Sequence, residues 1–256
     1  VDKEDILQEL QLLQGIVEKR NTMPILANIL MNVTESEIEL TGTDLEVGLR
    51  THFSAKIENS GAMTVSGKKL FEIVRSLAAE QEVVFSGGED LKMDITSGAS
   101  EFKGLCLPKE DYPQVPEAKF EKNIQLPLDQ FQEMIERVYF SITQEQRYYL
   151  NGALLILKGS SVELVSTDGH RLAYTSMQNE GMKVDEEIRG IVSKKTLGEM
   201  RKFEKGGLEF DLDENNLFFK VENRTLISRV IEGKFPNYDA VIPKENPHSM
   251  VLSRDL

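Results

Sequence analysis

Residues 150–173, LNGALLILKGSSVELVSTDGHRLA, repeat the pattern of residues 26–49, LANILMNVTESEIELTGTDLEVGL, at an offset of 124 positions. Apolar positions fall on apolar positions, and Thr167-Asp168 faces Thr43-Asp44. Further matches keep the same order and nearly the same spacing: Val65-Ser66 with Val192-Ser193, and Tyr112-Pro113 with Phe235-Pro236. Self-similarity at a nearly constant offset is typical of a repeated structural unit. We therefore predict that the chain contains two diverged copies of one module.

Each copy is predicted to contain two helices and several antiparallel strands. Apolar residues at helical spacing indicate a first helix in each copy: Ile6, Leu10, Leu13 and Val17, and then Phe131, Met134, Ile135 and Val138. A second helix is expected after Ser66 and after Ser193, whose hydroxyls could cap the first turn. In the second copy, residues 150–157 and 162–164 predict a hairpin, and further strands are expected at 208–212, 217–221 and 225–231. The predicted fold class is α+β, with two helices packed on antiparallel sheets in each module.

The polar segment 114–123, which carries Pro116, is predicted to connect the two modules. We place the first module at residues 1–116 and the second at 117–247. Residues 252–256 resemble residues 126–130, so 248–256 are expected to begin a truncated third module.

Composition limits the classes of protein that the chain can belong to. With 40% hydrophobic and 29% charged residues the chain is typical of a folded protein, and no apolar run reaches the roughly 20 residues that a membrane helix needs. The single cysteine, Cys106, cannot form an internal disulfide and is expected to be a small buried side chain. These features favour a soluble cytoplasmic protein. The net charge of −13 argues against nucleic acid as a partner, unless the cations are gathered on one surface.

The sequence offers little for catalysis. His52, His170 and His248 are too scattered for a metal cluster, so no metal or other cofactor is expected. Asp168 and His170 could form an acid–base pair, but Thr-Asp recurs in both copies. We therefore expect this aspartate to accept hydrogen bonds from backbone amides at the end of a strand. The chain is not predicted to be an enzyme.

Two lysines follow each expected serine cap, Lys68-Lys69 and Lys194-Lys195. Cations in the first turn oppose the helix dipole at a cost of roughly 0.3–1 kcal/mol each. Their recurrence suggests a use such as attracting phosphate, although a solvated lysine pair is an equally good interpretation.

Three segments carry a resemblance to a known family: residues 147–152 (RYYLNG), 167–173 (TDGHRLA) and 233–238 (GKFPNY). Together with 21–26 (NTMPIL) and 41–46 (TGTDLE), they make the chain resemble the bacterial DNA polymerase III β subunit, the replicative sliding clamp. The resemblance implies a homodimeric ring of three modules per protomer, of which this chain carries two. Double-stranded DNA would pass through the ring without sequence-specific contacts, and helices would line the hole. An acidic exterior could then coexist with a basic lining.

Matching positions suggest functional residues. The resemblance implies six DNA-facing candidates: Arg20, Gln144, Tyr148, Tyr149, Lys194 and Lys195. It also implies a pocket between the second and third modules that binds short peptides from the polymerase, the clamp loader and repair proteins. These peptides contain glutamine and large apolar residues. The second-module side of this pocket would comprise Leu150, Thr167, Gly169, His170, Arg171, Leu172, Pro236 and Val241.

Two alternatives to a clamp remain open at this point. The repeat could serve as a DNA-independent scaffold for protein interactions, or a hydrolase could use Asp168 and His170. Peptide binding that depends on Leu172 favours the clamp, whereas turnover that depends on His170 favours the hydrolase.

Overall fold

The computed structural model describes residues 1–17, 23–79, 81–87, 90–143, 148–243 and 245–253. The elements of the first half are α1 (Lys3–Leu13), β1 (Asn28–Val33), β2 (Glu37–Thr43), β3 (Val47–Ser54), β4 (Gly61–Ser66), α2 (Gly67–Ser76), β5 (Val84–Gly87), β6 (Lys92–Ser97) and β7 (Ser100–Leu107). The elements of the second half are β8 (Ile124–Pro127), α3 (Leu128–Tyr139), β9 (Gly152–Gly159), β10 (Ser161–Thr167), β11 (Leu172–Gln178), β12 (Val184–Ser193), α4 (Lys194–Met200), β13 (Gly207–Leu212), β14 (Asn216–Val221) and β15 (Arg224–Arg229). Short 3-10 turns are η1 (Pro24–Ala27), η2 (Lys109–Asp111), η3 (Tyr148–Leu150) and η4 (Tyr238–Ala240).

The predicted helices form where the apolar spacing requires them. Ile6 and Leu10 on α1, and Phe131 and Ile135 on α3, are fully buried, so each helix turns one apolar stripe toward the sheets. Val17 is also buried but lies beyond the end of α1.

The serine caps differ between the copies. The Ser193 hydroxyl accepts a hydrogen bond from the Thr196 amide at 3.0 Å, as predicted for α4. The Ser66 hydroxyl makes no capping hydrogen bond to α2, so that prediction was wrong. Ser66 has φ −55° and ψ 114°, Ser193 has φ −63° and ψ 150°, and only the second geometry brings the hydroxyl to the helix amides.

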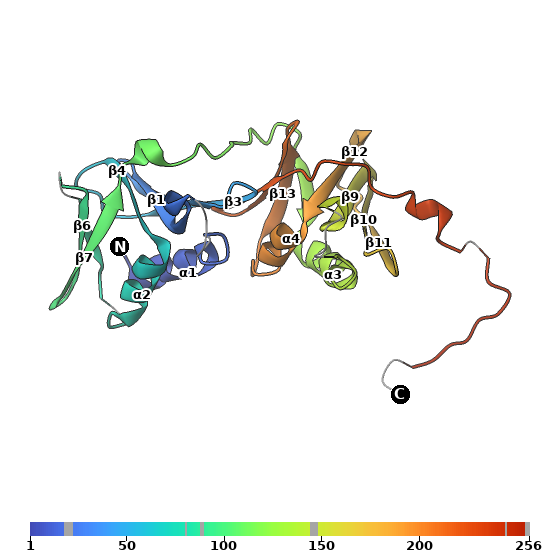
Figure 1. Cartoon of the computed structure of the whole chain (residues 1–256), viewed down its shortest axis with the longest axis horizontal. Helices are drawn as coiled ribbons and strands as arrows, with labels where there is room; N and C mark the ends of the chain where they lie inside the picture. Colours follow the sequence, from blue (N-terminus) through green and yellow to red (C-terminus); the bar gives the residue numbers. More distant parts are fainter. Residues whose placement is uncertain (18–22, 80, 88–89, 144–147, 244, 254–256) are drawn as a thin grey trace.

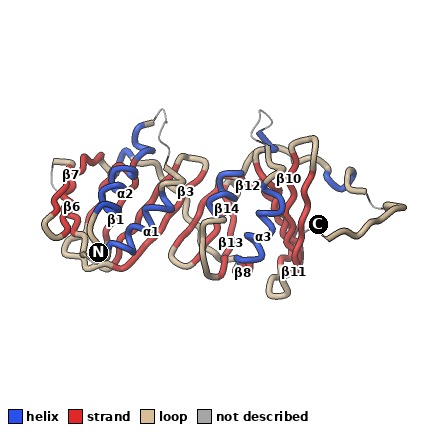
Figure 2. Tube along the Cα trace, turned by 90° about the horizontal axis from the view of Figure 1, so that it is seen from below, coloured by secondary structure: helices blue, strands red, loops and turns tan. Residues whose placement is uncertain are grey.

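Antiparallel strands form two sheets. One sheet has eleven strands in the order β5-β6-β7-β4-β1-β2-β3-β15-β14-β13-β8, and the other has four in the order β11-β10-β9-β12. Strand β3 of the first half pairs with β15 of the second half, with Leu49 opposite Leu226. The large sheet therefore runs continuously across the junction. The four helices lie on one side of the molecule, below the sheets in Figure 1 and toward the viewer in Figure 2.

The internal repeat is visible in hydrogen bonds at the atomic level. The Thr43 hydroxyl donates to the Val47 carbonyl at 3.0 Å and accepts from the Leu45 amide at 3.0 Å. The Thr167 hydroxyl donates to the Arg171 carbonyl at 2.7 Å and accepts from the Gly169 amide at 3.0 Å. The same turn therefore closes β2 in one copy and β10 in the other.

A buried ion pair joins the two halves beside the shared sheet. Glu9 on α1 accepts hydrogen bonds from Arg224 on β15, with Arg224 Nε 3.0 Å and 3.1 Å from the two carboxylate oxygens. The Thr51 hydroxyl donates to the same carboxylate at 2.6 Å. These hydrogen bonds to the Glu9 carboxylate raise the pKa of Arg224 above its already high ordinary value.

The single cysteine of the chain lies on β7. Cys106 is buried, as predicted, and burial raises the pKa of its thiol. No helix in the described ranges is long and apolar enough to cross a membrane.

Candidate functional site

The predicted peptide-binding residues lie around the turn that follows β10. Gly169, His170 and Arg171 form this turn, Thr167 ends β10 and Leu172 begins β11. Gly169 has a φ of 90°, a conformation that costs a glycine little. Leu150, at the end of η3, and the segment that carries Pro236 and Val241 complete the predicted set.

The Asp168 carboxylate holds this turn in place. Its Oδ1 accepts hydrogen bonds from the amides of His170 and Arg171, each at 3.0 Å, and its Oδ2 pairs with Arg171 Nε at 2.9 Å. The backbone hydrogen bond from Arg171 and then that from His170 lower the pKa of Asp168 to about 2. Such an acid is a poor proton acceptor near neutral pH. This geometry confirms the predicted structural role and speaks against the hydrolase interpretation.

A pH titration tests this role of Asp168. Because its folded pKa of about 2 lies below the unfolded value near 3.9, the stabilisation is fully present above about pH 4. It should be lost as the pH falls through about 2. Carbon NMR of the Asp168 carboxyl should give a midpoint close to 2. A midpoint at or above 3.9 would contradict the described hydrogen bonds.

An apolar cluster lies next to the turn. Leu150, Leu154, Ile156, Val165, Ile191, Ile231, Phe235 and Tyr238 form it, with Leu172 and Ile242 packed against it. Leu150 is 2% exposed and Thr167 8%, whereas Val241 is 67% exposed. Leu172 is half-buried, and Gly169, His170, Arg171 and Pro236 are exposed. The predicted residues thus include a buried base and an accessible rim.

Two aromatic residues beside this surface were not predicted. The Arg171 guanidinium lies 5.2 Å from the centre of the Phe140 ring, and Arg171 Nη2 donates to the Phe140 carbonyl at 2.9 Å. Tyr174 is 43% exposed and stacks on Tyr238, with ring centres 6.0 Å apart. Tyr174 could have been found by the two-residue period of a strand that starts at Leu172. Phe140 follows the end of α3 outside its apolar stripe, which gave no such signal.

The predicted DNA-facing residues have different surroundings. Arg20 and Gln144 lie outside the described residues, and Tyr148 is described only by its backbone in η3. Tyr149 is 36% exposed and packs against Gly233, where an added Cβ would lie 3.0 Å from Tyr149 Cβ. Lys194 donates to the Ile142 carbonyl at 2.9 Å and lies 5.2 Å from the Tyr139 ring centre.

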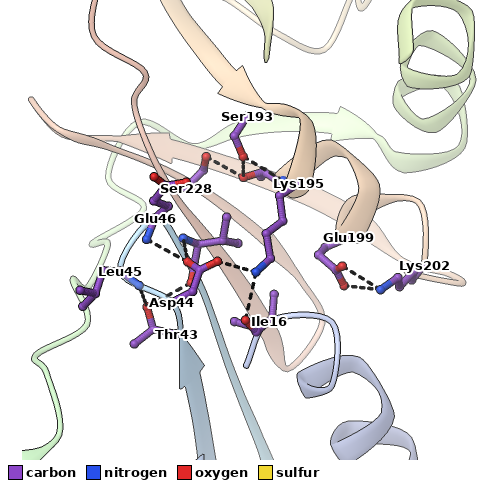
Figure 3. Close-up of polar contacts among 12 residues, drawn as sticks. Ile16, Thr43, Asp44, Leu45, Glu46, Ser193, Lys195, Glu199, Lys202 and Ser228 are labelled. Carbon is purple, nitrogen blue, oxygen red and sulfur yellow. Dashed lines mark hydrogen bonds and ion pairs between the residues drawn. The ribbon is translucent and has the colours of Figure 1, made fainter. Parts of the chain in front are cut away.

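Lys195 is held at the junction between the two halves. Its ammonium pairs with the carboxylate of Asp44 and donates to the Ile16 carbonyl at 3.1 Å (Figure 3). The Asp44 side chain is 5% exposed and the Lys195 side chain 32%. This charge is neutralised within the chain, so the structure does not support Lys195 as a free DNA-facing cation.

The helical side carries further cations, several of them close to carboxylates. On α2, Lys68 and Lys69 are exposed, and Lys68 pairs with Glu72 at 3.7 Å. Three cations on or next to α3 and α4 are also paired with carboxylates: Arg137 with Glu133, Arg201 with Glu136 and Lys202 with Glu199. Among the described residues, no group of three or more His, Cys, Asp or Glu side chains is arranged to hold a metal ion.

Comparison with solved structures identifies the class of protein. The DNA polymerase III subunit beta of Pseudomonas aeruginosa matches 96% of this chain and 68% of its own with a TM-score of 0.90 and 32% identity. A second structure of that organism's sliding clamp, bound to griselimycin, matches the same shares with a TM-score of 0.89 and 32% identity. The fold is therefore that of a DNA sliding clamp.

The sequence comparisons give the family. The model of the DNA polymerase III beta subunit N-terminal domain matches residues 1–116, and that of the central domain matches residues 125–237. The beta sliding clamp of Pseudomonas putida is 34% identical over 260 residues, which cover 99% of this chain and 70% of the relative. The chain belongs to the DNA polymerase III beta subunit family.

Proposed function

We propose that this chain is the first two modules of a ring-shaped, non-catalytic clamp that slides on double-stranded DNA and holds other proteins there through short peptides. The modules are proposed at 1–116 and 117–247, with a third starting at 248–256. Its partners would be the replicative polymerase, the clamp loader and repair proteins of the bacterial cytoplasm. The proposal of peptide binding rests on the apolar cluster beside the Asp168 turn, with Leu172 at the rim of this cluster.

The chemistry of that surface suits a short apolar segment. Leu172 and Val241 offer aliphatic contact at the rim of a buried apolar base, and exposed groups of the turn can orient a peptide backbone. The Tyr238 hydroxyl donates to Glu163 at 3.3 Å, and its ring supports Tyr174. Burial, and then the charge of Glu163, raise the pKa of Tyr238 to about 12, so this hydroxyl remains a donor.

Peptide titration tests this assignment. A fluorescein-labelled peptide Gln-Leu-Ala-Leu-Phe with blocked ends should bind the protein. The Leu172→Glu substitution should weaken the strongest binding of this peptide at least about tenfold. The reason is that the new carboxylate must lose water against the peptide's aliphatic side chains. Leu105→Glu, at a leucine that is 76% exposed on β7, is the matched control and should leave the affinity unchanged. Equal affinity of the wild type and Leu172→Glu would remove Leu172 from the site.

Homodimer formation is the second part of the proposal. The outer end of the first half exposes Val84 on β5, Leu105 and Leu107 on β7, at 50%, 76% and 39%, and β5 is an edge strand. An exposed apolar group at a sheet edge is suited to pairing with another chain. We propose that the third module of a partner protomer covers it.

Mass measurement in solution tests ring closure. The two-module chain should remain a monomer, and a version extended by about 110–120 residues, one further domain, should dimerise. In the extended protein, Leu105→Glu should increase the dissociation constant at least about tenfold, because a charge replaces a buried contact. Leu172→Glu serves there as the control that leaves the dimer intact. An extended chain that stays monomeric at all concentrations would contradict the ring.

DNA binding is proposed for the helical side of the molecule. Arg20, Gln144, Tyr148 and Tyr149 remain candidates, as does Lys194, whereas Lys195 is better explained as a junction residue. The exposed Lys68 and Lys69 add two cations on the same side. Such contacts would be weak and sensitive to salt, which suits a protein that must slide.

A further inference from the structure

A groove lies at the junction of the two halves, on the side of the Thr43 turn that faces away from Lys195. In Figure 3, Asp44 points to Lys195 while Leu45 points in the opposite direction. The groove has a volume of about 310 Å³, within the range of small ligand pockets. Its walls are the Thr43–Gly48 turn, the connector at Gln114–Pro116, and residues at the ends of β14 and β15.

The internal repeat relates this groove to the proposed peptide surface. The Thr43 turn has the hydrogen bonds of the Thr167 turn, and the connector follows Tyr112-Pro113 as the C-terminal segment follows Phe235-Pro236. The groove lining therefore includes the first-half counterparts of Thr167 and of residues 169–172. At this groove the following module is part of the chain. Ile227 and Arg229 on β15 of that second half form the wall opposite the Thr43 turn.

The lining of the groove mixes apolar and polar side chains, and its formal charges sum to zero. Val47 and Ile227 are buried at its base, and Leu45 is 48% exposed at its rim. Amide side chains come from Gln114, Asn215 and Asn216. The formal charges of Glu46 and Arg229 cancel, on a chain whose net charge is −13. This neutral lining complements an uncharged segment with an aliphatic side chain and an amide, better than it complements a nucleic acid or an acidic peptide.

We infer that this groove is a second, weaker docking site for short uncharged peptides that carry glutamine and an aliphatic anchor. The inference rests on the proposed peptide function of the Leu172 surface. The site is weaker for a steric reason. Gly48 stands where Leu172 stands in the other copy, and a Cβ on Gly48 would lie 3.2 Å from Val115 Cγ1. The chain's own Val115 thus fills part of the apolar base and leaves room for fewer side chains of the peptide.

Four proteins test the inference: the wild type, Leu45→Glu, Leu172→Glu and the double variant. The peptide is the acetylated and amidated Gln-Leu-Ala-Leu-Phe, and a scrambled sequence is the control. The wild type should show two binding phases, and Leu172→Glu should keep the weaker one. Adding Leu45→Glu should weaken that remaining phase at least about tenfold. Leu45 is exposed in a turn, so the substitution leaves the core unchanged.

Photo-cross-linking of the wild type provides an independent measurement. A diazirine on the second leucine of the peptide should label residues 43–48, 114–116 or 227–229, in addition to the surface around Leu172. If Leu172→Glu alone abolishes all binding and no label reaches these ranges, the groove inference fails while the proposed function stands. If the peptide binds none of the four proteins, both the groove inference and the proposed peptide function are contradicted. Dimerisation of the wild type that Leu45→Glu prevents would assign the groove to a second copy of the chain and overturn the peptide site.

Discussion

Arg224→Ala is expected to lower the free energy of unfolding by about 3–5 kcal/mol, the cost of breaking a buried ion pair. The Arg224 side chain is 9% exposed and that of Glu9 is 5%, so the substitution leaves a nearly buried carboxylate without its cation. After the substitution the Glu9 carboxylate would keep only the hydroxyl of Thr51. Urea unfolding followed by circular dichroism would measure the loss.

Two matched variants separate the ion pair from general effects of substitution. Arg229→Ala, at the exposed end of the same strand, should change the stability by no more than about 0.5 kcal/mol. The double variant Glu9→Leu with Arg224→Met replaces both charges by apolar groups and should recover most of the loss. If Arg224→Ala matches the wild type within 1 kcal/mol, the pair is solvated and does not hold the halves together.

Local structure could be predicted from the sequence because the signals for it are local. The helical stripe of Phe131 and Ile135, and the turn shared by Thr43 and Thr167, depend on residues within a few positions of one another. The failure at Ser66 is of the same local kind, because a cap depends on backbone angles that a serine does not set by itself.

Contacts between the halves could not be predicted from the sequence. Glu9 and Arg224 are 215 positions apart, and Asp44 and Lys195 are 151 positions apart. The pairing of β3 with β15 uses backbone groups that every strand offers, so the alternation of side chains does not name the neighbour. For the candidate site, the resemblance supplied the residues around Leu172. Only the structure separated the buried Leu150 from the exposed Val241 and added Phe140 and Tyr174.

Lys195→Met is expected to destabilise the protein by about 2 kcal/mol, between the values for exposed and for buried ion pairs. Asp44 is nearly buried, and its Oδ1 already accepts from the amides of Glu46 and Val47, so Oδ2 would be left without its cation. By contrast, the association with double-stranded DNA should keep its dependence on salt, because this ammonium is already neutralised. Urea unfolding and fluorescence anisotropy with labelled duplex DNA at several salt concentrations measure the two quantities.

Lys68→Met is the matched control, because the offset of 127 positions that places Leu70 on Leu197 also places Lys68 on Lys195. The Lys68 side chain is 62% exposed on α2, so its loss should change the stability by no more than about 0.5 kcal/mol. If Lys68 contacts a phosphate, its loss should reduce the slope of log affinity against log salt by about 0.9. The opposite result, a reduced slope and unchanged stability for Lys195→Met, would return Lys195 to the DNA-facing residues. Lys68 and Lys195, which occupy the same position in the repeated helix, would then both contact DNA. In the arrangement proposed above, Lys68 contacts DNA and Lys195 stabilises the junction.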